Sequence, residues 1–477
     1  MRKVTHDLVV VGAGSGGYSA ARTARGLGAD VAMIDHGPLG GLCILRGCMP
    51  SKTLLASSGA IADIRDAAEL GIHAEHVRVD FPHIMKRKRE LIAGFADFRI
   101  EGLREFPLYE GFAKFVGERE VQVGDDLVVT AKKFIIATGS VVAPAALPGL
   151  IETGFIDSDG ALELGELPKS LVVLGGGYIG CELGQFFSRM GVETTIVLRS
   201  KHLLSIEDDD IGFALMEYYR GEGITVETET HITRVSSRNG KKLVHVVRNG
   251  IEGEIETDEI LYCLGRVPNL NGLDLDRAKV PCHHITGVDV DNTMRTCNPD
   301  VFAVGDVTGA HMLVHVAIYQ GEIAARNAVN GGREEASYDL VKTHTIFSDP
   351  EIGIVGETER DLQKHGIAYV KGVYAFAEHG KAMCLNKTQG FVKMMADPAT
   401  GKILGAAVIG PHGSDLIHEV IVAMSFGSTV QHFMKIPHLH PTLAEIWTYP
   451  AEECCEKIGA AGDDDVSEEV AVGASAG

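Results

Sequence analysis

One arrangement of apolar and polar positions occurs twice along the chain. At Leu8–Gly28, an apolar run of the kind that forms a β-strand is followed by a cluster of glycines and a helix-forming stretch. The same order returns at Leu171–Gly191, and short strand-like segments between Val226 and Asp258 follow it. A strand, a glycine-rich turn and a helix in this order predict an α/β unit that binds a nucleotide. We therefore expect two such units.

The pattern changes from about Lys342 onward. Gly390–Ala396 and Ile403–Ile409 alternate as antiparallel strands do. Helical stretches follow at Ser414–Phe426 and Leu443–Ile458. These elements predict a third domain, of the α+β class.

Length and charge narrow the choice of function. The chain has 477 residues, too many for one ordinary core, and its 57 glycines suit sheets with many tight strand-to-helix turns. Lys and Arg total 44 against 65 Asp and Glu, which gives a net charge of −21. Because nucleic acids and anionic membranes bind basic surfaces, we expect neither as a partner. The strongest basic cluster, Lys86–Arg89, is interpreted as a solvated helix face.

The sequence predicts neither a membrane span nor an export signal. The apolar run Leu8–Val11 stops at Gly12, far short of the ~20 residues that a span needs, and it lacks a cleavage pattern. The default compartment is then the reducing cytoplasm, where paired cysteines are more often catalytic than structural. The nine cysteines are odd in number and scattered, so they form no disulfide framework.

The first glycine cluster has the spacing G-x-G-x-x-G, in Gly12, Gly14 and Gly17. Gly12 permits a tight turn, Gly14 lets the backbone approach a pyrophosphate, and Gly17 lets the helix pack on the strand. The phosphates then face a helix N-terminus, where free N–H groups favour anions. Asp35 ends the next strand, eighteen residues after Gly17, and is placed to accept hydrogen bonds from ribose hydroxyls.

The second cluster repeats the spacing in Gly175, Gly177 and Gly180. The strand after it does not end in an acid but continues into Arg199 and Lys201. An acid would favour the free 2′-hydroxyl of NAD, whereas a basic pair could hold the 2′-phosphate of NADP. The sequence therefore leans slightly to NADP, with NAD as the alternative if these two are ordinary surface residues.

Two cysteines, Cys43 and Cys48, follow directly on the first unit. In a regular helix, residues five apart have Cα atoms about 8–9 Å apart, whereas a disulfide tolerates at most ~7 Å. A bond between them needs a distorted turn, which Gly47 makes easier, and distorted disulfides are easily reduced. Taken alone, the pair could be buried or bind metal. No second pair of ligands lies nearby in the sequence, so no metal site is predicted.

The cysteine segment resembles the signature of a known enzyme family. Gly40–Cys43 and Gly47–Lys52 are similar to the signature of the class I pyridine nucleotide–disulfide oxidoreductases. The resemblance extends to about Glu456 and includes Ala137-Thr138-Gly139, Gly265-Arg266-Val267-Pro268-Asn269 and Val304-Gly305-Asp306-Val307. It implies an α/β fold with two Rossmann-like domains, the first holding FAD and the second a nicotinamide nucleotide.

The resemblance implies roles for single residues. Cys43 would be the interchange thiol that meets the substrate, and Cys48 the thiol against the flavin. Lys52 and Glu182 would pair near the flavin N5 atom, where hydride arrives. Tyr178 would cover the flavin until the nicotinamide displaces it.

Further contacts to FAD are implied by the other matching segments. Asp306 would bind the ribityl chain. The helix from about Met312 would aim its N-terminus at the flavin N1–C2 edge and stabilise the anionic reduced flavin. The remaining cofactor contacts implied are Ala137, Thr138, Gly139 and Arg266.

The run His438–Glu445 resembles the ending of the same family. His440 would move protons on and off thiols, since imidazole titrates in the right range, and Glu445 would orient it. His438 is expected to serve packing or a hydrogen bond. In the family this segment comes from the other subunit, so the resemblance implies a homodimer whose active sites span the interface.

The part after Lys342 is most similar to the dihydrolipoamide dehydrogenases, for example at Phe347–Glu351. This implies a lipoyl-type dithiol, free or on a partner protein, as the substrate. An NADPH-dependent disulfide or mercuric reductase is the alternative, and the vicinal Cys454 and Cys455 resemble C-terminal thiols of mercuric reductases. Ordinary surface or interface cysteines are the simpler interpretation of that pair. A non-catalytic flavoprotein subunit of a larger complex is the alternative from another class.

These observations predict four parts of the chain. An FAD-binding domain would consist of residues 1–150 and 271–340, and an NAD(P)-binding domain of residues 151–270. Residues 341–458 would form the dimerisation domain. The last part, 459–477, is rich in alanine, glycine and acids and is expected to be a disordered tail.

Overall fold

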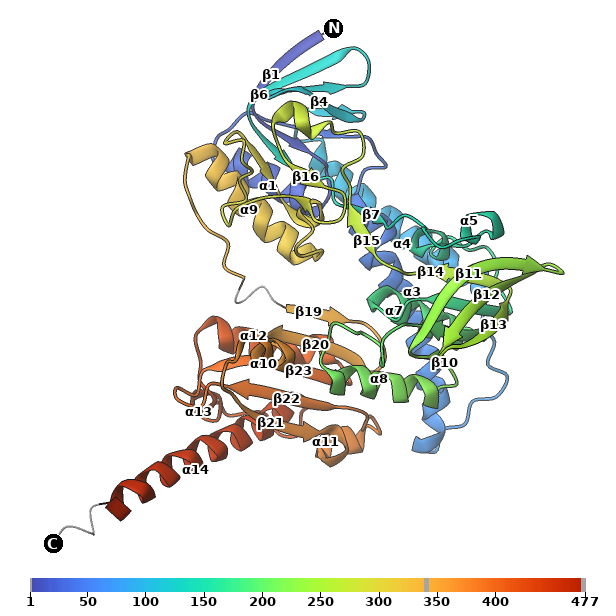
Figure 1. Cartoon of the computed structure of the whole chain (residues 1–477), viewed down its shortest axis with the longest axis vertical. Helices are drawn as coiled ribbons and strands as arrows, with labels where there is room; N and C mark the ends of the chain where they lie inside the picture. Colours follow the sequence, from blue (N-terminus) through green and yellow to red (C-terminus); the bar gives the residue numbers. More distant parts are fainter. Residues whose placement is uncertain (1, 339–342, 473–477) are drawn as a thin grey trace.

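A computed structural model describes the backbone of residues 2–338 and 343–472, with side chains up to Ala460. Figure 1 shows a first α/β unit at the top, a second at the right, and a third sheet with its helices at the bottom. Residues 1, 339–342 and 473–477 lie outside the description. The expected domain junction near residue 340 and the last five residues of the expected tail therefore lie outside it as well.

The first sheet has seven strands in the order β3-β2-β1-β6-β5-β4, with β18 paired to β6. Its strands are β1 (Arg2–Val11), β2 (Val31–Asp35), β3 (Leu108–Glu110), β4 (Ala113–Gly117), β5 (Glu120–Val123), β6 (Leu127–Ile136) and β18 (Val301–Ala303). Strands β3, β2, β1, β6 and β18 run parallel. Parallel strands are covered on both faces, which is why Leu8–Val11 is an unbroken apolar run and is buried throughout.

Helix α1 (Ser15–Gly26) packs against α9 (Val314–Asn330), so a late segment completes the first unit. The two backbones approach closely, because a Cβ atom at Gly321 would lie 2.4 Å from the carbonyl oxygen of Gly16. The other helices of this unit are α2 (Gly41–Arg46), α3 (Cys48–Asp66), η1 (Ala67–Leu70) and α4 (Phe81–Leu103). Short elements precede α9: η2 (Leu275–Ala278), β16 (Cys282–His283), β17 (Gly287–Val288) and η3 (Gly305–Thr308).

The basic cluster Lys86–Arg89 lies on α4, and the expectation of a solvated face is wrong at Lys88. Its side chain is buried, and its Nζ atom donates to the carbonyl oxygen of Leu162 and to the Glu163 carboxylate, each at 2.5 Å. An ammonium can be buried when such partners compensate for lost hydration. The sequence could not show this, because the partners lie more than 70 residues further along the chain.

The second unit has a parallel sheet in the order β10-β9-β8-β14. Its strands are β8 (Ser170–Leu174), β9 (Glu193–Val197), β10 (Thr225–Glu227) and β14 (Glu259–Tyr262). An antiparallel sheet adds β11 (Thr230–Arg238), β12 (Lys241–Arg248) and β13 (Ile251–Thr257). The helices are α5 (Leu150–Thr153), α6 (Ser158–Ala161), α7 (Tyr178–Arg189) and α8 (Asp209–Gly221). The chain enters through β7 (Ser140–Val142) and leaves through β15 (Arg266–Pro268), and these two strands pair.

The third sheet is antiparallel in the order β19-β20-β23-β22-β21. Its strands are β19 (Thr343–Ile346), β20 (Glu351–Gly356), β21 (Val370–Ala375), β22 (Phe391–Ala396) and β23 (Ile403–Gly410). The antiparallel strands expected at Gly390–Ala396 and Ile403–Ile409 are confirmed, because they form β22 and β23, which pair with each other. Its helices are α10 (Glu359–His365), η4 (Phe376–Glu378), α11 (Gly380–Cys384), α12 (Gly413–Ser425), α13 (Val430–Phe433), η5 (Ala444–Trp447) and α14 (Thr448–Val472).

Helix α14 continues to Val472, where the sequence analysis expects a disordered tail from Gly459. The helix projects from the third sheet in Figure 1. Its first turns are anchored by the buried Ala451 and Cys454. Alanine and glutamate are strong helix formers, and extending an existing helix needs no new nucleus, which explains the correction. Among the described residues, no helix is long and apolar enough to cross a membrane.

Candidate active site

The first glycine cluster forms an open cradle at the N-terminus of α1. Gly12 has φ +107°, and a Cβ atom there would lie 2.3 Å from the carbonyl oxygen of Ala137. A Cβ atom at Gly17 would lie 1.9 Å from the carbonyl oxygen of Gly12. At Gly14, by contrast, it would meet nothing closer than 4.0 Å, and no side chain caps the helix. The free N–H groups and this open space fit a pyrophosphate.

Asp35 lies beside this cradle at the end of β2. Its two carboxylate oxygens accept hydrogen bonds from the backbone N–H groups of Ala13 and Gly37, each at 2.7 Å. These bonds fix the carboxylate next to the helix N-terminus and leave each oxygen with a further lone pair. Asp35 is therefore placed where the sequence predicts a ribose contact.

The second cradle repeats the first at the N-terminus of α7. A Cβ atom at Gly180 would lie 2.1 Å from the carbonyl oxygen of Gly175, whereas one at Gly177 would meet nothing within 4 Å. After β9, Arg199 is exposed and forms no ion pair among the described residues. Lys201 is also exposed, but its ammonium pairs with Asp209. The two basic residues predicted to bind a 2′-phosphate are thus not equivalent.

Cys43 lies in α2, and Cys48 is the first residue of α3. Gly47 separates the two helices with φ −133° and ψ −117°, so the segment departs from one regular helix as the sequence predicts. Both cysteines are free and partly buried. A hydrogen bond from Cys43 lowers the pKa of Cys48 to about 7, and the charge of Lys52 acts in the same direction. The same bond, together with burial, raises the pKa of Cys43 above its ordinary value.

Lys52, one turn along α3, forms an ion pair with Glu182 of α7. Its Nζ atom donates to both carboxylate oxygens at 3.0 and 2.8 Å, and it lies 4.4 Å from the centre of the Phe347 ring. Glu182 is buried and also accepts from the backbone N–H of Phe347. The predicted pairing of Lys52 with Glu182 is therefore present, and Phe347 is a neighbour that the sequence analysis did not assign.

Asp306 lies in η3, where burial raises the pKa of its carboxyl group. The hydroxyl of Ser140 donates to it at 2.6 Å and accepts from the Arg266 guanidinium at 3.0 Å. Thr138 donates to the carbonyl oxygen of Asn269, so the predicted Ala137–Gly139 segment and the Arg266–Asn269 segment meet. Ser140 was missed, although it follows Gly139 directly. A partly buried acid at this edge of the sheet fits the hydroxyl-rich ribityl chain of FAD.

Tyr178 begins α7 and is held by a group that the sequence analysis missed. Its hydroxyl donates to the buried Glu207 at 2.5 Å, and His344 of β19 donates to the same oxygen at 2.9 Å. Burial and the charge of Glu207 raise the pKa of Tyr178 well above its ordinary value, so it keeps its proton. No local motif marks Glu207 or His344, because the contact joins two units of the chain.

His440 and Glu445 form the predicted pair. The His440 Nδ1 atom lies 2.9 Å from a Glu445 oxygen, and its side chain is 80% exposed. His438 instead hydrogen-bonds Glu419 at 2.5 Å, in agreement with a structural role. Within the described part of the chain, no hydrogen bond or ion pair joins His440 to the cysteine segment.

The vicinal cysteines of α14 do not form an accessible thiol pair. Cys454 is fully buried in the core of the third unit, and burial raises its pKa to about 12. Cys455 is partly buried, and burial raises its pKa as well. The surface or interface position expected for both is therefore wrong for Cys454, which packs in the core of the third unit. A buried, protonated thiol is poorly reactive in thiol–disulfide exchange.

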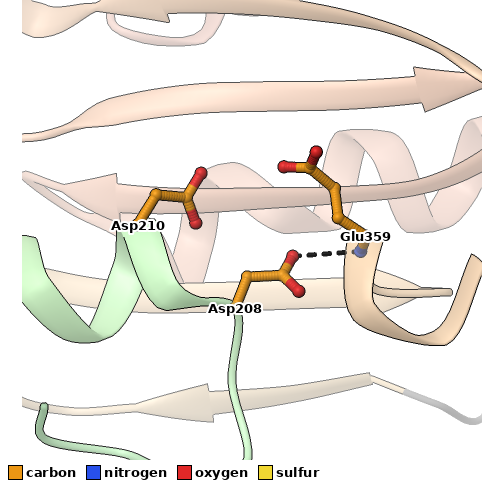
Figure 2. Close-up of side chains that lie close together, drawn as sticks. All are labelled: Asp208, Asp210 and Glu359. Atoms are coloured by element: carbon orange, nitrogen blue, oxygen red, sulfur yellow. Dashed lines mark hydrogen bonds between the residues drawn. The ribbon is translucent and has the colours of Figure 1, made fainter. Parts of the chain in front are cut away.

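An acidic cluster at the junction of the second and third units is partly neutralised by a buried lysine. Figure 2 shows Asp208 and Asp210 at the start of α8 and Glu359 at the start of α10, close enough together to hold a metal ion. The fully buried Lys393 ammonium lies among them, 2.8 Å from Asp208, 2.8 Å from Asp210 and 3.0 Å from Glu359. The cluster is thus an ion network that joins the two units.

Two protein-family models match most of the chain. The model of the pyridine nucleotide-disulphide oxidoreductases matches residues 6–321, and that of their dimerisation domain matches residues 343–451. A dihydrolipoyl dehydrogenase of Chlamydia muridarum is 35% identical over 455 residues, or 93% of this chain and 96% of that protein. A mercuric reductase of Bacillus cereus is 34% identical, over 92% of this chain and 70% of that protein.

A solved structure gives the same result for the fold. The HOCl-induced flavoprotein disulfide reductase from Escherichia coli, in its Cu(II) complex, has a TM-score of 0.84 at 25% identity and covers 95% of this chain and 99% of that one. The expected α/β fold, family and enzyme class are confirmed. The chain belongs to the class I pyridine nucleotide–disulfide oxidoreductases, FAD-dependent enzymes that use a nicotinamide nucleotide, and it carries the dimerisation domain with which they form homodimers.

Proposed function

We propose that this enzyme oxidises a lipoyl-type dithiol through Cys43 and Cys48. The observation that carries the proposal is the pair of free, partly buried thiols on either side of Gly47, where their mutual hydrogen bond lowers the pKa of Cys48 and raises that of Cys43. Such an enzyme needs one sulfur that stays ionised beside the flavin and one that exchanges with the substrate. The choice of a lipoyl group is supported by the similarity to a dihydrolipoyl dehydrogenase over 93% of the chain.

In the proposed reaction, His440 of the partner subunit takes a proton from the first substrate thiol. The thiolate attacks Cys43 Sγ of the Cys43–Cys48 disulfide, forms a mixed disulfide and releases Cys48 as a thiolate. The second substrate thiol attacks the substrate sulfur of the mixed disulfide and closes the product disulfide, and its proton passes to Cys43. The reduced enzyme then holds a Cys43 thiol, a Cys48 thiolate and a protonated His440. Bound FAD supplies the redox couple that carries the electron pair on to the nicotinamide nucleotide.

The remaining predicted residues would hold and shield the cofactors. The cradle of Gly12, Gly14 and Gly17, with Asp35, would bind the adenosine half of FAD, and Asp306 its ribityl chain. Lys52, fixed by Glu182, would place a positive charge beside the flavin ring. Tyr178 would cover the ring until the nicotinamide enters. Their backbone and side-chain contacts, given above, support these roles.

We prefer NADP as the nicotinamide nucleotide. Strand β9 is followed by the buried Leu198 rather than by an acid, so nothing there selects for a free 2′-hydroxyl. The exposed Arg199 offers a guanidinium that forms no ion pair with any described residue and could bind a 2′-phosphate. Lys201 supports the proposal less, since Asp209 already neutralises it.

The second candidate is NADPH-dependent reduction of a disulfide or of Hg(II). The similarity to a mercuric reductase over 92% of the chain favours it. The electrons would then flow from the nucleotide to the cysteine pair. The buried Cys454 leaves Cys43 and Cys48 to meet such a substrate without a C-terminal thiol pair.

Anaerobic single-turnover spectroscopy of the holoenzyme tests the proposal. Dihydrolipoamide should reduce the Cys43–Cys48 disulfide and produce a thiolate–flavin charge-transfer band, which Cys48→Ser should abolish. Cys282→Ser, at an exposed cysteine outside the site, is the matched control and should keep the band. Rapid reduction by NADPH or NADH with no reduction by dihydrolipoamide would contradict the lipoyl assignment and favour the second candidate.

A further inference from the structure

Glu445 lies between two histidines. One of its carboxylate oxygens is 2.9 Å from Nδ1 of His440, and the other is 3.6 Å from Nε2 of His379. The two histidines differ in their surroundings, because the His440 side chain is 80% exposed and the His379 side chain is 0% exposed. One imidazole is therefore available to a substrate, and the other belongs to the interior of the third unit.

The hydrogen bonds of His379 determine which of its nitrogens carries the proton. His379 caps the N-terminus of α11, where its Nδ1 atom accepts from the backbone N–H of Ala382 at 3.4 Å. Burial lowers the pKa of His379, which favours the neutral ring. In a neutral imidazole only one nitrogen bears hydrogen, so the proton lies on Nε2. A donor thus faces Glu445.

This donor has no other partner. The Nε2 atom of His379 is buried and makes no hydrogen bond with any described residue. A buried N–H that stays unpaired is costly, and the 3.6 Å to the Glu445 oxygen exceeds a hydrogen bond by only about half an ångström. A small rotation of the carboxylate closes that gap. Contacts in a catalytic group are often long before the substrate binds.

The aromatic groups around His379 hold its ring in this orientation. Tyr449 of α14 meets the ring edge-on, with the ring centres 6.2 Å apart. Tyr449 in turn stacks on Tyr374 of β21 at 3.9 Å. The titratable groups that face His379 are thus Tyr449, Glu445 and, beyond the carboxylate, His440. Glu445 is the one among them that accepts a hydrogen bond as an anion.

We propose that His379 is a positioning residue that holds one oxygen of Glu445, so that the other oxygen stays directed at Nδ1 of His440. His440 then keeps its proton on Nδ1 and presents Nε2 to the substrate thiol. The inference rests on the proposed function in one respect, because it takes His440 as the proton acceptor. It adds a third member to the His440–Glu445 pair.

Two substitutions separate this role from a structural one. In His379→Asn, the amide places an acceptor near the position of Nδ1, so the cap on α11 is kept and the donor to Glu445 is lost. In His379→Gln, the longer amide places a donor near the position of Nε2, so the contact with Glu445 is kept and the cap is lost. If His379 only capped α11, the Gln variant would be the impaired one.

The rate at which dithiothreitol produces the thiolate–flavin charge-transfer band, measured anaerobically across pH 5.5–9 on the holoenzyme, is the first readout. A freed carboxylate stabilises the His440 imidazolium less. His379→Asn should therefore slow this step by roughly tenfold, which is part of what a general base contributes. It should also shift the acidic side of the pH–rate profile to lower pH. Flavin reduction by NADPH, which does not use His440, should be unchanged. His379→Gln should restore both the rate and the pH at which the rate falls on the acidic side of the profile.

A second readout separates failure of this inference from failure of the proposed function. Histidine labelled with ¹³C at Cε1 reports the pKa of His440 by NMR, with His440→Gln giving the assignment. A lower pKa of His440 in His379→Asn, but not in His379→Gln, supports the inference even if dithiothreitol does not reduce the Cys43–Cys48 disulfide. An unchanged pKa in His379→Asn overturns it, whatever the substrate is.

Discussion

The hydroxyl of Tyr178 donates a 2.5 Å hydrogen bond to Glu207, a buried carboxylate that His344 also contacts. Tyr178 starts the helix of the second cradle, whereas His344 belongs to the third unit. Tyr178, the residue proposed to cover the flavin, is therefore held in place by a hydrogen bond to a charged carboxylate. Any motion of Tyr178 must break or stretch this bond.

Replacing Tyr178 with Phe should ease entry of the nicotinamide. A hydrogen bond to a charged group contributes about 1.5–3 kcal/mol, part of which the displacement has to overcome. We expect the KM for the nicotinamide nucleotide to fall severalfold, with the KM for the dithiol unchanged. Tyr262→Phe, which removes a hydroxyl bonded to the carbonyl oxygen of Pro144, is the control. A change in the dithiol KM alone would argue against the lid.

The pKa of Cys48, lowered to about 7, predicts how the reduced enzyme responds to pH. The thiolate is present above that pKa and is protonated below it, so a thiolate–flavin charge-transfer band should fade as the pH falls through 7. Cys43→Ala removes the hydrogen bond that contributes most to the lowering, and the midpoint should rise. Absorbance titration measures both midpoints, on the NADPH-reduced wild-type holoenzyme and on the Cys43→Ala holoenzyme with its flavin left oxidised. A midpoint that Cys43→Ala leaves in place would contradict the assigned cause.

The exposed Arg199 predicts the nucleotide preference. Arg199→Ala should raise the KM for NADPH by at least tenfold and leave that for NADH nearly unchanged, because a 2′-phosphate pairs strongly with a guanidinium. Lys201→Ala should have a smaller effect, since Asp209 already pairs with that lysine. Steady-state kinetics with both nucleotides decides the matter. Equal effects of Arg199→Ala on the two nucleotides would remove the support for NADP.

The buried Lys393 predicts a large loss of stability. Lys393→Met would leave Asp208, Asp210 and Glu359 without their shared cation, and breaking a buried ion network costs about 3–5 kcal/mol. Lys371→Met removes a partly exposed partner of Glu359 and should cost about 1 kcal/mol or less. Thermal unfolding of the holoenzymes compares the two. Similar midpoints for both variants would show that the network contributes little.

Most parts of the site that the sequence predicts are local motifs, whereas the pairing of Lys52 with Glu182, 130 residues apart, was implied by the family resemblance. The glycines of both cradles, the pair Cys43 and Cys48, and the pair His440 and Glu445 each lie within a few residues of one another. Their chemistry follows from spacing and residue type, and their structural positions follow from the strand or helix that carries them. The overall α/β fold is predicted for the same reason, because the unit of strand, glycine-rich turn and helix occurs twice in the sequence.

The parts that the sequence did not predict are contacts between distant segments. Lys88 meets its acceptor 74 residues away, and Glu207 meets His344 137 residues away. His379 lies 3.6 Å from Glu445, which is 66 residues further along the chain. Packing of whole units creates these neighbours, so no periodicity or spacing reveals them. The missed extension of α14 has another cause, since composition alone does not distinguish a solvated helix from a disordered tail.

The pairing of β7 with β15 places Val142 opposite Arg266, so the chain leaves the first unit and returns to it at one point. The whole second unit is thereby inserted like a cassette between two adjacent positions. Recombination could exchange such a cassette without disturbing either end of the FAD half, which would let nucleotide preference evolve apart from flavin binding. The same arrangement suits protein engineering, because a donor unit needs only ends that lie as close together as these two strands.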